Sequence, residues 1–215
     1  MLLKQRKKYS IWVAPILSVA LALITLAFYL TKDYATVLTS AKIIISALIP
    51  SLLPLTEITF KRNFSISVNC LITLHVILSV YLGSAFAFYS LIPWWDLFLH
   101  GYFGFVGSAV LLMIFHELNG KMKMFGLCVF VFLSVMGCAA IWEAFEFTTD
   151  IIFTQDAQGV NEAISLGLNP IKDTMTDIII TALGAVIFLA GEIIRRFIQK
   201  ERKNTKNTKI FSELY

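Results

Sequence analysis

Long apolar runs recur six times along the 215 residues, and they constrain the fold more than any other feature. A helix needs about 20 mostly apolar residues to cross the roughly 30 Å hydrocarbon core of a bilayer. We predict transmembrane helices over residues 11–30, 37–59, 67–89, 95–115, 124–147 and 174–197. Prolines 50 and 54 interrupt the second segment, which a bundle tolerates when neighbours satisfy the freed carbonyls. The sequence therefore predicts an all-α polytopic membrane bundle of six helices.

The composition excludes the other broad classes of protein. Apolar residues make up 58% of the chain and charged residues only 15%, whereas soluble domains carry roughly 45–50% and about 25%. The net charge of +4 is therefore no indication of nucleic-acid binding. We expect one membrane-embedded domain over residues 1–215, with basic tails at 1–10 and 199–215.

The basic residues predict how the bundle is oriented. Fifteen of the 18 lysines and arginines fall before the first span, on alternate loops, or at and beyond the end of the sixth. Cytoplasmic loops collect Lys and Arg, so both termini are predicted to be cytoplasmic. The first apolar run of about 20 residues is longer than the 7–15 residues of a signal-peptide core, and we interpret it as a retained anchor.

Carboxylates and one imidazole gather where the last three predicted helices meet the outer surface. Each helix contributes residues spaced three or four apart, which places them on one face of that helix. The residues are Asp96, His100, Glu143, Glu146, Asp150, Asp173 and Asp177. The predicted topology brings them to a similar depth, so they are expected to share one layer.

Such a layer needs a cation. Two like charges 4 Å apart repel by about 4 kcal/mol at an effective dielectric constant of 20, and ionisable groups inside membranes mark functional sites by default. We predict a divalent metal (zinc, manganese or magnesium) and no organic cofactor. The predicted ligands are Asp96, His100, Glu143, Glu146 and Asp177, of which Glu143 and Asp177 are also the catalytic candidates.

Simpler interpretations exist for several of these residues. Asp173 can cap the last helix, Asp150 can be a solvated loop acid, and Asp96 can complement a helix dipole. Lys42 either extends to the outer interface or serves as a counter-ion for the acids. Lys42, Asp150 and Asp173 are therefore predicted as secondary site residues, beside the five predicted metal ligands. A buried polar network that holds the bundle together is the alternative for His100, Glu143, Glu146 and Asp177.

Two further features bear on the layer. The outer loop 148–170 is long and too apolar to be a plain tether, so we expect it to fold over the acids as a lid or a partly re-entrant cap. Small residues line one side of the fourth helix at Gly101, Gly104, Gly107 and Ser108, and part of the sixth at Thr181, Gly184 and Gly191. Such stripes favour close helix packing.

Three short motifs resemble those of a known family. An Asp-x-x-x-His pair opens one span, a Glu-x-x-Glu pair closes the next, and an Asp-x-x-x-Asp pair followed by a glycine opens the last. These are Asp96 and His100, Glu143 and Glu146, and Asp173 and Asp177 with Gly184. Their order and spacing resemble the YjdF-like family of bacterial integral membrane proteins and, more distantly, VanZ-like proteins.

The resemblance covers roughly residues 94–186. The Gln158-Gly159 pair is similar to a pair that precedes the last motif in YjdF-like sequences, while Thr181 stands where VanZ-like proteins have Asn. It implies a small multi-pass protein of the bacterial plasma membrane with a shared acidic and histidine site. The link of VanZ-like members to glycopeptide tolerance implies a role at the cell envelope.

Three functions are compatible with these residues. The first is a metal-dependent membrane hydrolase or transferase acting on a lipid or envelope substrate. The second is a non-catalytic membrane component that binds an envelope molecule or partner protein. The third is a proton- or cation-coupled transporter, against which stand the absence of a recognisable inverted repeat in the sequence and the position of the acids at one face. Membrane lipids are the expected surroundings in each case.

Overall fold

The computed structural model describes residues 12–33, 36–52, 55, 66–154 and 156–213, and every regular element within these ranges is a helix. The all-α prediction is therefore confirmed. The N-terminal basic tail and the end of the predicted second span, residues 56–59, lie outside the described residues.

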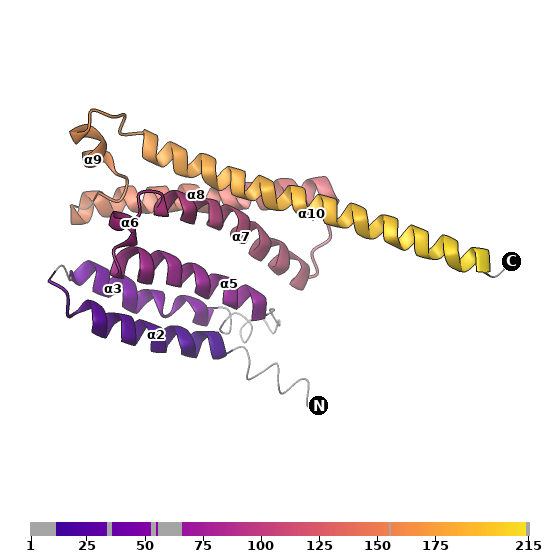
Figure 1. The fold of residues 1–215 in the computed structure, drawn as a ribbon, viewed down its shortest axis with the longest axis horizontal. Helices are drawn as coiled ribbons and strands as arrows, with labels where there is room; N and C mark the ends of the chain where they lie inside the picture. The colour runs from indigo at the N-terminus through magenta and orange to yellow at the C-terminus, as the bar shows by residue number, and fades with distance from the viewer. Residues whose placement is uncertain (1–11, 34–35, 53–54, 56–65, 155, 214–215) are drawn as a thin grey trace.

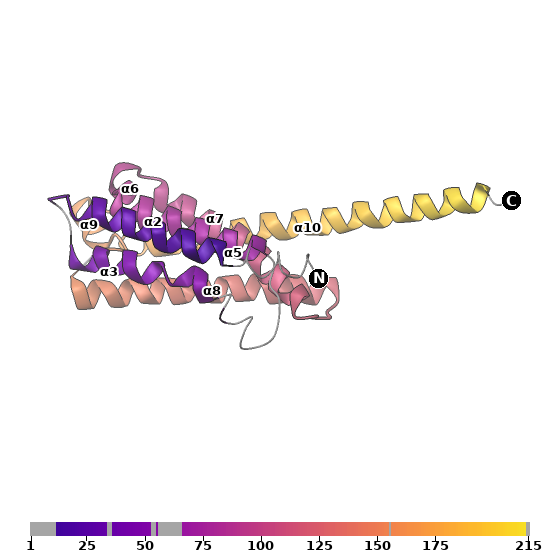
Figure 2. The ribbon, with the colours of Figure 1, turned by 90° about the horizontal axis from the view of Figure 1, so that it is seen from below.

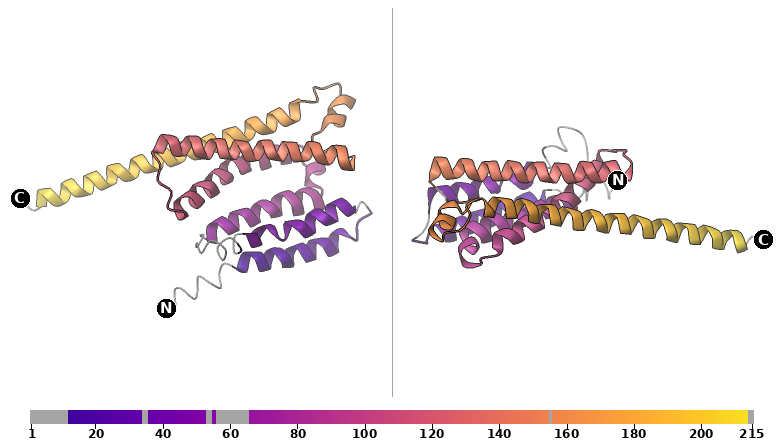
Figure 3. Two further views of the ribbon diagram at one scale, coloured as in Figure 1. Left: turned by 180° about the vertical axis from the view of Figure 1, so that it is seen from behind. Right: turned by 90° about the horizontal axis from the view of Figure 1, so that it is seen from above.

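The helices form two groups along the chain, which Figure 1 and the left view of Figure 3 show one above the other. The N-terminal group comprises α2 (Val13–Tyr29), α3 (Val37–Ser46), the 3-10 turn η1 (Ile49–Ser51), α5 (Ile66–Val76) and the π-helical segment η2 (Ile77–Ala85). The C-terminal group comprises α7 (Trp95–Glu117), α8 (Met124–Phe153) and α10 (Lys172–Glu213). The short helices α6 (Phe88–Leu91) and α9 (Val160–Ser165) lie at the end of the bundle where α7 and α10 begin (Figure 1). We call this the site end.

Three helices of the C-terminal group are long and apolar enough to cross a membrane. The spanning stretches are Trp95–Glu117 with 23 residues, Met124–Phe153 with 30, and Lys172–Arg202 with 31. The first three predicted spans correspond to shorter apolar helices, Pro15–Tyr29, Val37–Ser46 and Cys70–Ala85. The described part of the chain thus has three full-length candidate spans and three shorter apolar helices.

The predicted continuous helix beginning at residue 37 is wrong. α3 ends at Ser46, and the chain passes into the η1 turn, which holds Pro50 in its first residues. Proline has no backbone N–H and its ring collides with the carbonyl four residues earlier, so an α-helix rarely continues through it. Proline can be tolerated within a membrane helix, but in this segment the α-helix does not continue through Pro50.

The boundaries of the predicted loop 148–170 are also wrong. α8 continues through 148–153, and the connection to α10 contains the short helix α9. No helix-breaking residue precedes Thr154, which adopts the left-handed conformation with φ 53° and ends the helix. Likewise, residues 199–213 of the predicted C-terminal tail are helical, and α10 extends well beyond the other helices (Figures 1 and 2).

Glycines allow α7 and α10 to lie in direct backbone contact. A Cβ atom added to Gly104 would collide with the backbone carbonyl of Thr181, and one added to Gly184 would collide with that of Gly101. The predicted role in close packing is therefore confirmed for Gly104 and Gly184. It is not confirmed for Gly107, whose Cβ would meet only Phe103 of the same helix, or for Gly191, whose Cβ would meet no described atom within 4 Å. The contact fixes the first turns of the two helices side by side, which is where their ionisable residues lie.

Candidate metal centre

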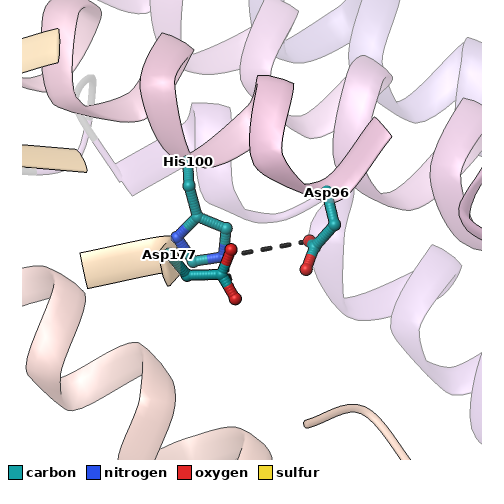
Figure 4. A group of neighbouring side chains, drawn as sticks. All are labelled: Asp96, His100 and Asp177. Atoms are coloured by element: carbon teal, nitrogen blue, oxygen red, sulfur yellow. Dashed lines mark ion pairs between the residues drawn. The ribbon is translucent and has the colours of Figure 1, made fainter. Parts of the chain in front are cut away.

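The first two turns of α7 carry the two residues on which the site is built. Asp96 lies in the first turn, where a negative charge complements the helix dipole. His100 follows four residues later on the same face and is buried, with 7% of its surface exposed. Figure 4 shows both side chains projecting from α7 toward Asp177.

The imidazole faces carboxylates from three different helices. Its Nε2 atom lies 3.8 Å from Oδ1 of Asp96 on α7, 3.9 Å from Oε1 of Glu143 on α8, and 4.0 Å from Oδ2 of Asp177 on α10. These separations are too long for hydrogen bonds. The imidazole and the three carboxylates, which we call the His100 group, therefore surround a small common space. None of the carboxylates bonds directly to the imidazole.

A fifth residue, Thr181, holds the opposite edge of the ring. Its hydroxyl Oγ1 lies 3.3 Å from the backbone oxygen of His100 and 3.4 Å from Nδ1 of the imidazole. A hydroxyl has one proton, and donating it to the carbonyl leaves the oxygen to accept from Nδ1–H. In that tautomer Nε2 carries a lone pair directed toward the carboxylates, which is the form in which histidine binds metals.

Two of the carboxylates are buried without a hydrogen-bond partner. Glu143 is 6% exposed and Asp177 1% exposed. Among the described residues, neither oxygen of Glu143 nor Oδ1 of Asp177 has a hydrogen-bond partner. Buried polar atoms are nearly always satisfied because leaving one unpaired costs about 1–3 kcal/mol, and more for a charged group.

The arrangement has the dimensions of a metal site. One ligand atom from each of Asp96, His100 and Asp177 can be chosen so that all lie within 4.8 Å of one another, and this group could hold a metal ion. Zinc binds histidine nitrogen and carboxylate oxygen at about 2.0–2.2 Å, so two ligands on opposite sides of one ion are separated by at most about 4.4 Å. The distances of 3.8 to 4.0 Å from Nε2 fall within that limit.

Two of the predicted site residues on α8 accept hydrogen bonds from residues outside this group. Glu146 is half-buried and accepts a hydrogen bond of 2.8 Å from Nε1 of Trp142. Asp150 accepts the backbone N–H groups of Ala157 and Gln158, at 2.8 and 3.1 Å. Asp150 thus secures the segment after α8, and it is neither a plain solvated acid nor part of the His100 group.

The other two secondary residues also lie outside the group. Asp173 is in the first turn of α10, which begins one residue earlier, so it does not occupy the predicted N-cap position. Lys42 lies on α3, which packs against α2 and η2. None of the ion pairs between described residues involves Lys42, so the structure gives no support to a role as counter-ion.

Gln158 and Gly159, which precede α9, contact both α8 and the first turn of α10. The side-chain amide of Gln158 donates to the backbone oxygen of Glu143 at 3.4 Å and to Oγ1 of Thr174 at 3.2 Å. Gly159 has a φ of 60°, and a Cβ there would lie 3.3 Å from Oδ2 of Asp173. These two residues therefore tie α8 to α10 beside the carboxylates.

The sequence linked Thr181 to helix packing and to the position of an Asn in VanZ-like proteins, and Gln158 to the family resemblance, but it predicted neither as part of the site. The missed indication for Thr181 was its position four residues after Asp177, which places both side chains on the same face of α10. Gln158 gave no comparable indication, because its contacts depend on how the connection to α10 folds.

Comparison with known proteins identifies the family. A family model described as "Predicted membrane protein (DUF2238)" matches residues 12–196. The chain belongs to the DUF2238 family. No curated protein matches it, and no solved structure does. The matched region includes all three helices of the DUF2238 chain that contribute to the His100 group.

Proposed function

We propose that the chain is a metal-dependent membrane enzyme, with one divalent ion bound by Asp96, His100 and Asp177. The observation that carries this proposal is the imidazole Nε2 with carboxylates of three helices at 3.8 to 4.0 Å. No other group of three or more His, Cys, Asp or Glu residues with such spacing occurs among the described residues. Zinc, manganese and magnesium are the expected ions, because mixed imidazole and carboxylate sites suit them.

Charge balance favours an ion over the alternatives. A neutral imidazole presents a lone pair to three carboxylates, and lone pairs that face one another repel. A hydrogen-bonded polar network would show short contacts, but the Nε2–oxygen distances are 3.8 to 4.0 Å. A cation in the space between them would bind the imidazole, Asp96 and Asp177, and its charge would also stabilise the buried Glu143, whose oxygens lack hydrogen-bond partners in the described chain.

The residues fit a hydrolase or transferase reaction. A bound divalent ion polarises a phosphoryl or carbonyl oxygen and lowers the pKa of a bound water. Glu143 lies 3.9 Å from Nε2 of His100 but outside the compact group of three. We assign it the role of general base, because it is near enough to accept a proton from a nucleophile at the site. Asp177 is assigned as a ligand that also orients the reacting group.

The predicted orientation places this site at the outer face of a bacterial plasma membrane. Six spans with both termini cytoplasmic follow from the distribution of lysine and arginine. The likeness to YjdF-like and VanZ-like sequences supports a lipid or another cell-envelope molecule as the substrate. A phosphatase reporter fused after Tyr215 should be inactive in intact cells, whereas activity of this fusion outside the membrane would contradict the orientation.

The metal is tested by thermal unfolding of the purified protein with and without added ions. Zinc, manganese or magnesium should raise the melting temperature of the wild-type protein, because a ligand that binds only the folded state stabilises it. His100→Gln should abolish that gain. His116→Gln is the matched control, since His116 lies at the other end of α7 beside Arg196, at 3.0 Å. A gain that survives in His100→Gln would refute the site.

A further inference from the structure

A cavity of about 260 Å³ adjoins the metal centre. It lies between α7, α8 and the segments that precede α7. Asp96 and His100 form part of its lining, and much of the remainder is apolar or aromatic, as at Leu99, Phe103, Ala139 and Trp142. His75, Ser79 and Tyr89 add polar atoms to the lining. A ligand that fills the cavity must therefore be apolar over most of its length, and Asp96 with His100 is the place where a charged group would lie beside the metal centre.

The volume is ample for an apolar chain. A single water needs roughly 10–15 Å³ of such space, and the cavity offers about 260 Å³. It therefore has room for several consecutive methylene groups.

The cavity borders an exposed side of α8. Cys138 and Trp142 line it, and both side chains are exposed, Trp142 to 45%. α8 packs chiefly against α7 and α10, whereas the N-terminal helices contact the C-terminal group mainly through α7. The exposed Cys138 and Trp142 therefore offer a route by which an apolar chain could reach the cavity.

The charge at the end of the cavity beside Asp96 and His100 determines which ligand head group can bind there. Without a cation, the carboxylates of Asp96, Glu143 and Asp177 around His100 would repel an anion. With a divalent ion bound, the same position attracts oxygen anions, since zinc, manganese and magnesium bind them well. Binding of an anionic head should therefore require the metal.

We propose that this cavity holds the apolar chain of an amphiphile that enters from the membrane, with its oxyanion head at the metal beside Asp96 and His100. The inference rests on the proposed function, since it needs the bound ion. It narrows the substrate class to a single-chain phosphate or carboxylate amphiphile, or to one chain end of a larger lipid.

The native thiol of Cys138 provides a probe of this cavity. The protein would be placed in phosphatidylcholine nanodiscs with Cys70 and Cys128 replaced by serine, and labelled with N-ethylmaleimide. Decyl phosphate together with zinc should slow the labelling of Cys138 by about tenfold. Decanoate with zinc tests a carboxylate head. Inorganic phosphate and decanol, which each lack one half of the amphiphile, should protect weakly.

A variant that fills the cavity separates this inference from the metal itself. Cys138→Trp should retain the metal-dependent gain in melting temperature and lose binding of decyl phosphate, measured by calorimetry in the same nanodiscs. Ile141→Trp is the matched control, because Ile141 is exposed on α8 and does not line the cavity. The control should bind decyl phosphate as the wild type does.

The outcomes distinguish the two proposals. Decyl phosphate binding that is unchanged in Cys138→Trp, or equal with and without zinc in the wild type, would overturn the amphiphile inference and leave the metal centre standing. Failure of the wild-type protein to gain stability from any of the three ions would overturn the proposed function, and the inference with it.

Discussion

Replacing Thr181 with valine should weaken metal binding without touching a proposed ligand. Valine has nearly the shape of threonine but lacks the hydroxyl, so the two contacts of 3.3 and 3.4 Å to His100 are lost. Each is near the long limit of a hydrogen bond and is worth about 0.5–1.5 kcal/mol. Their combined loss is about 1–3 kcal/mol. At 1.4 kcal/mol for each factor of ten, the dissociation constant should rise roughly tenfold to a hundredfold, the range found when groups that orient metal ligands are removed.

Calorimetric titration of the purified protein with zinc or manganese measures this change directly. Thr181→Ser keeps the hydroxyl and should bind nearly as the wild type does. Thr176→Val makes the same substitution on an exposed part of α10, where the hydroxyl donates only to the backbone oxygen of Lys172 at 2.6 Å, and its dissociation constant should not change. A wild-type dissociation constant in Thr181→Val would refute the argument that this hydroxyl sets the tautomer and orientation of His100.

Three further predictions concern the bundle and the pH dependence of the metal site. Gly104→Ala should lower the free energy of unfolding by about 1–3 kcal/mol, because the new Cβ would meet the backbone of α10. Gly107→Ala should have little effect, since the atom nearest to its new Cβ would be 3.4 Å away. Denaturant unfolding of both variants in one detergent checks this. Glu192→Gln should lower the free energy of unfolding by about 1–2 kcal/mol, since a buried carboxylate that accepts hydrogen bonds of 2.6 Å from two arginines loses its charge. Glu201→Gln, at an exposed position, is the control in the same experiment. Equal losses of stability in the two variants would contradict the account. The gain in melting temperature from added metal should shrink as the pH falls from 7.5 to 5.5, because the ligands must be deprotonated to bind; a gain that grows over this range would contradict metal ligation by His100.

The sequence was sufficient to predict the class of the fold and the end of the bundle where the ionisable residues meet. Apolar length alone identified α7, α8 and the apolar part of α10, because hydrocarbon thickness sets the length of a spanning helix. The small residues at Gly104 and Gly184 predicted the close contact between α7 and α10. These inferences use spacing along one helix, which sequence records directly.

The predictions that failed depended on contacts or on local breaks in the backbone. The interruption after Ser46 reflects Pro50, whose effect in a membrane helix depends on which neighbours satisfy the freed carbonyl. Residues 148–153 were assigned to the outer loop because the apolar run of the fifth predicted span ends at residue 147, but they form the last turns of α8. The partners of Asp150 and Gln158 lie in the connection to α10, and no sequence spacing fixes that geometry.

The metal itself is tested most directly by X-ray diffraction from zinc-loaded crystals at wavelengths on either side of the zinc absorption edge. The account predicts one anomalous peak per chain at the site end, about 2.0–2.2 Å from Nε2 of His100 and from a carboxylate oxygen each of Asp96 and Asp177. An anomalous peak elsewhere, or none within bonding distance of His100 in crystals grown with excess zinc, would contradict it.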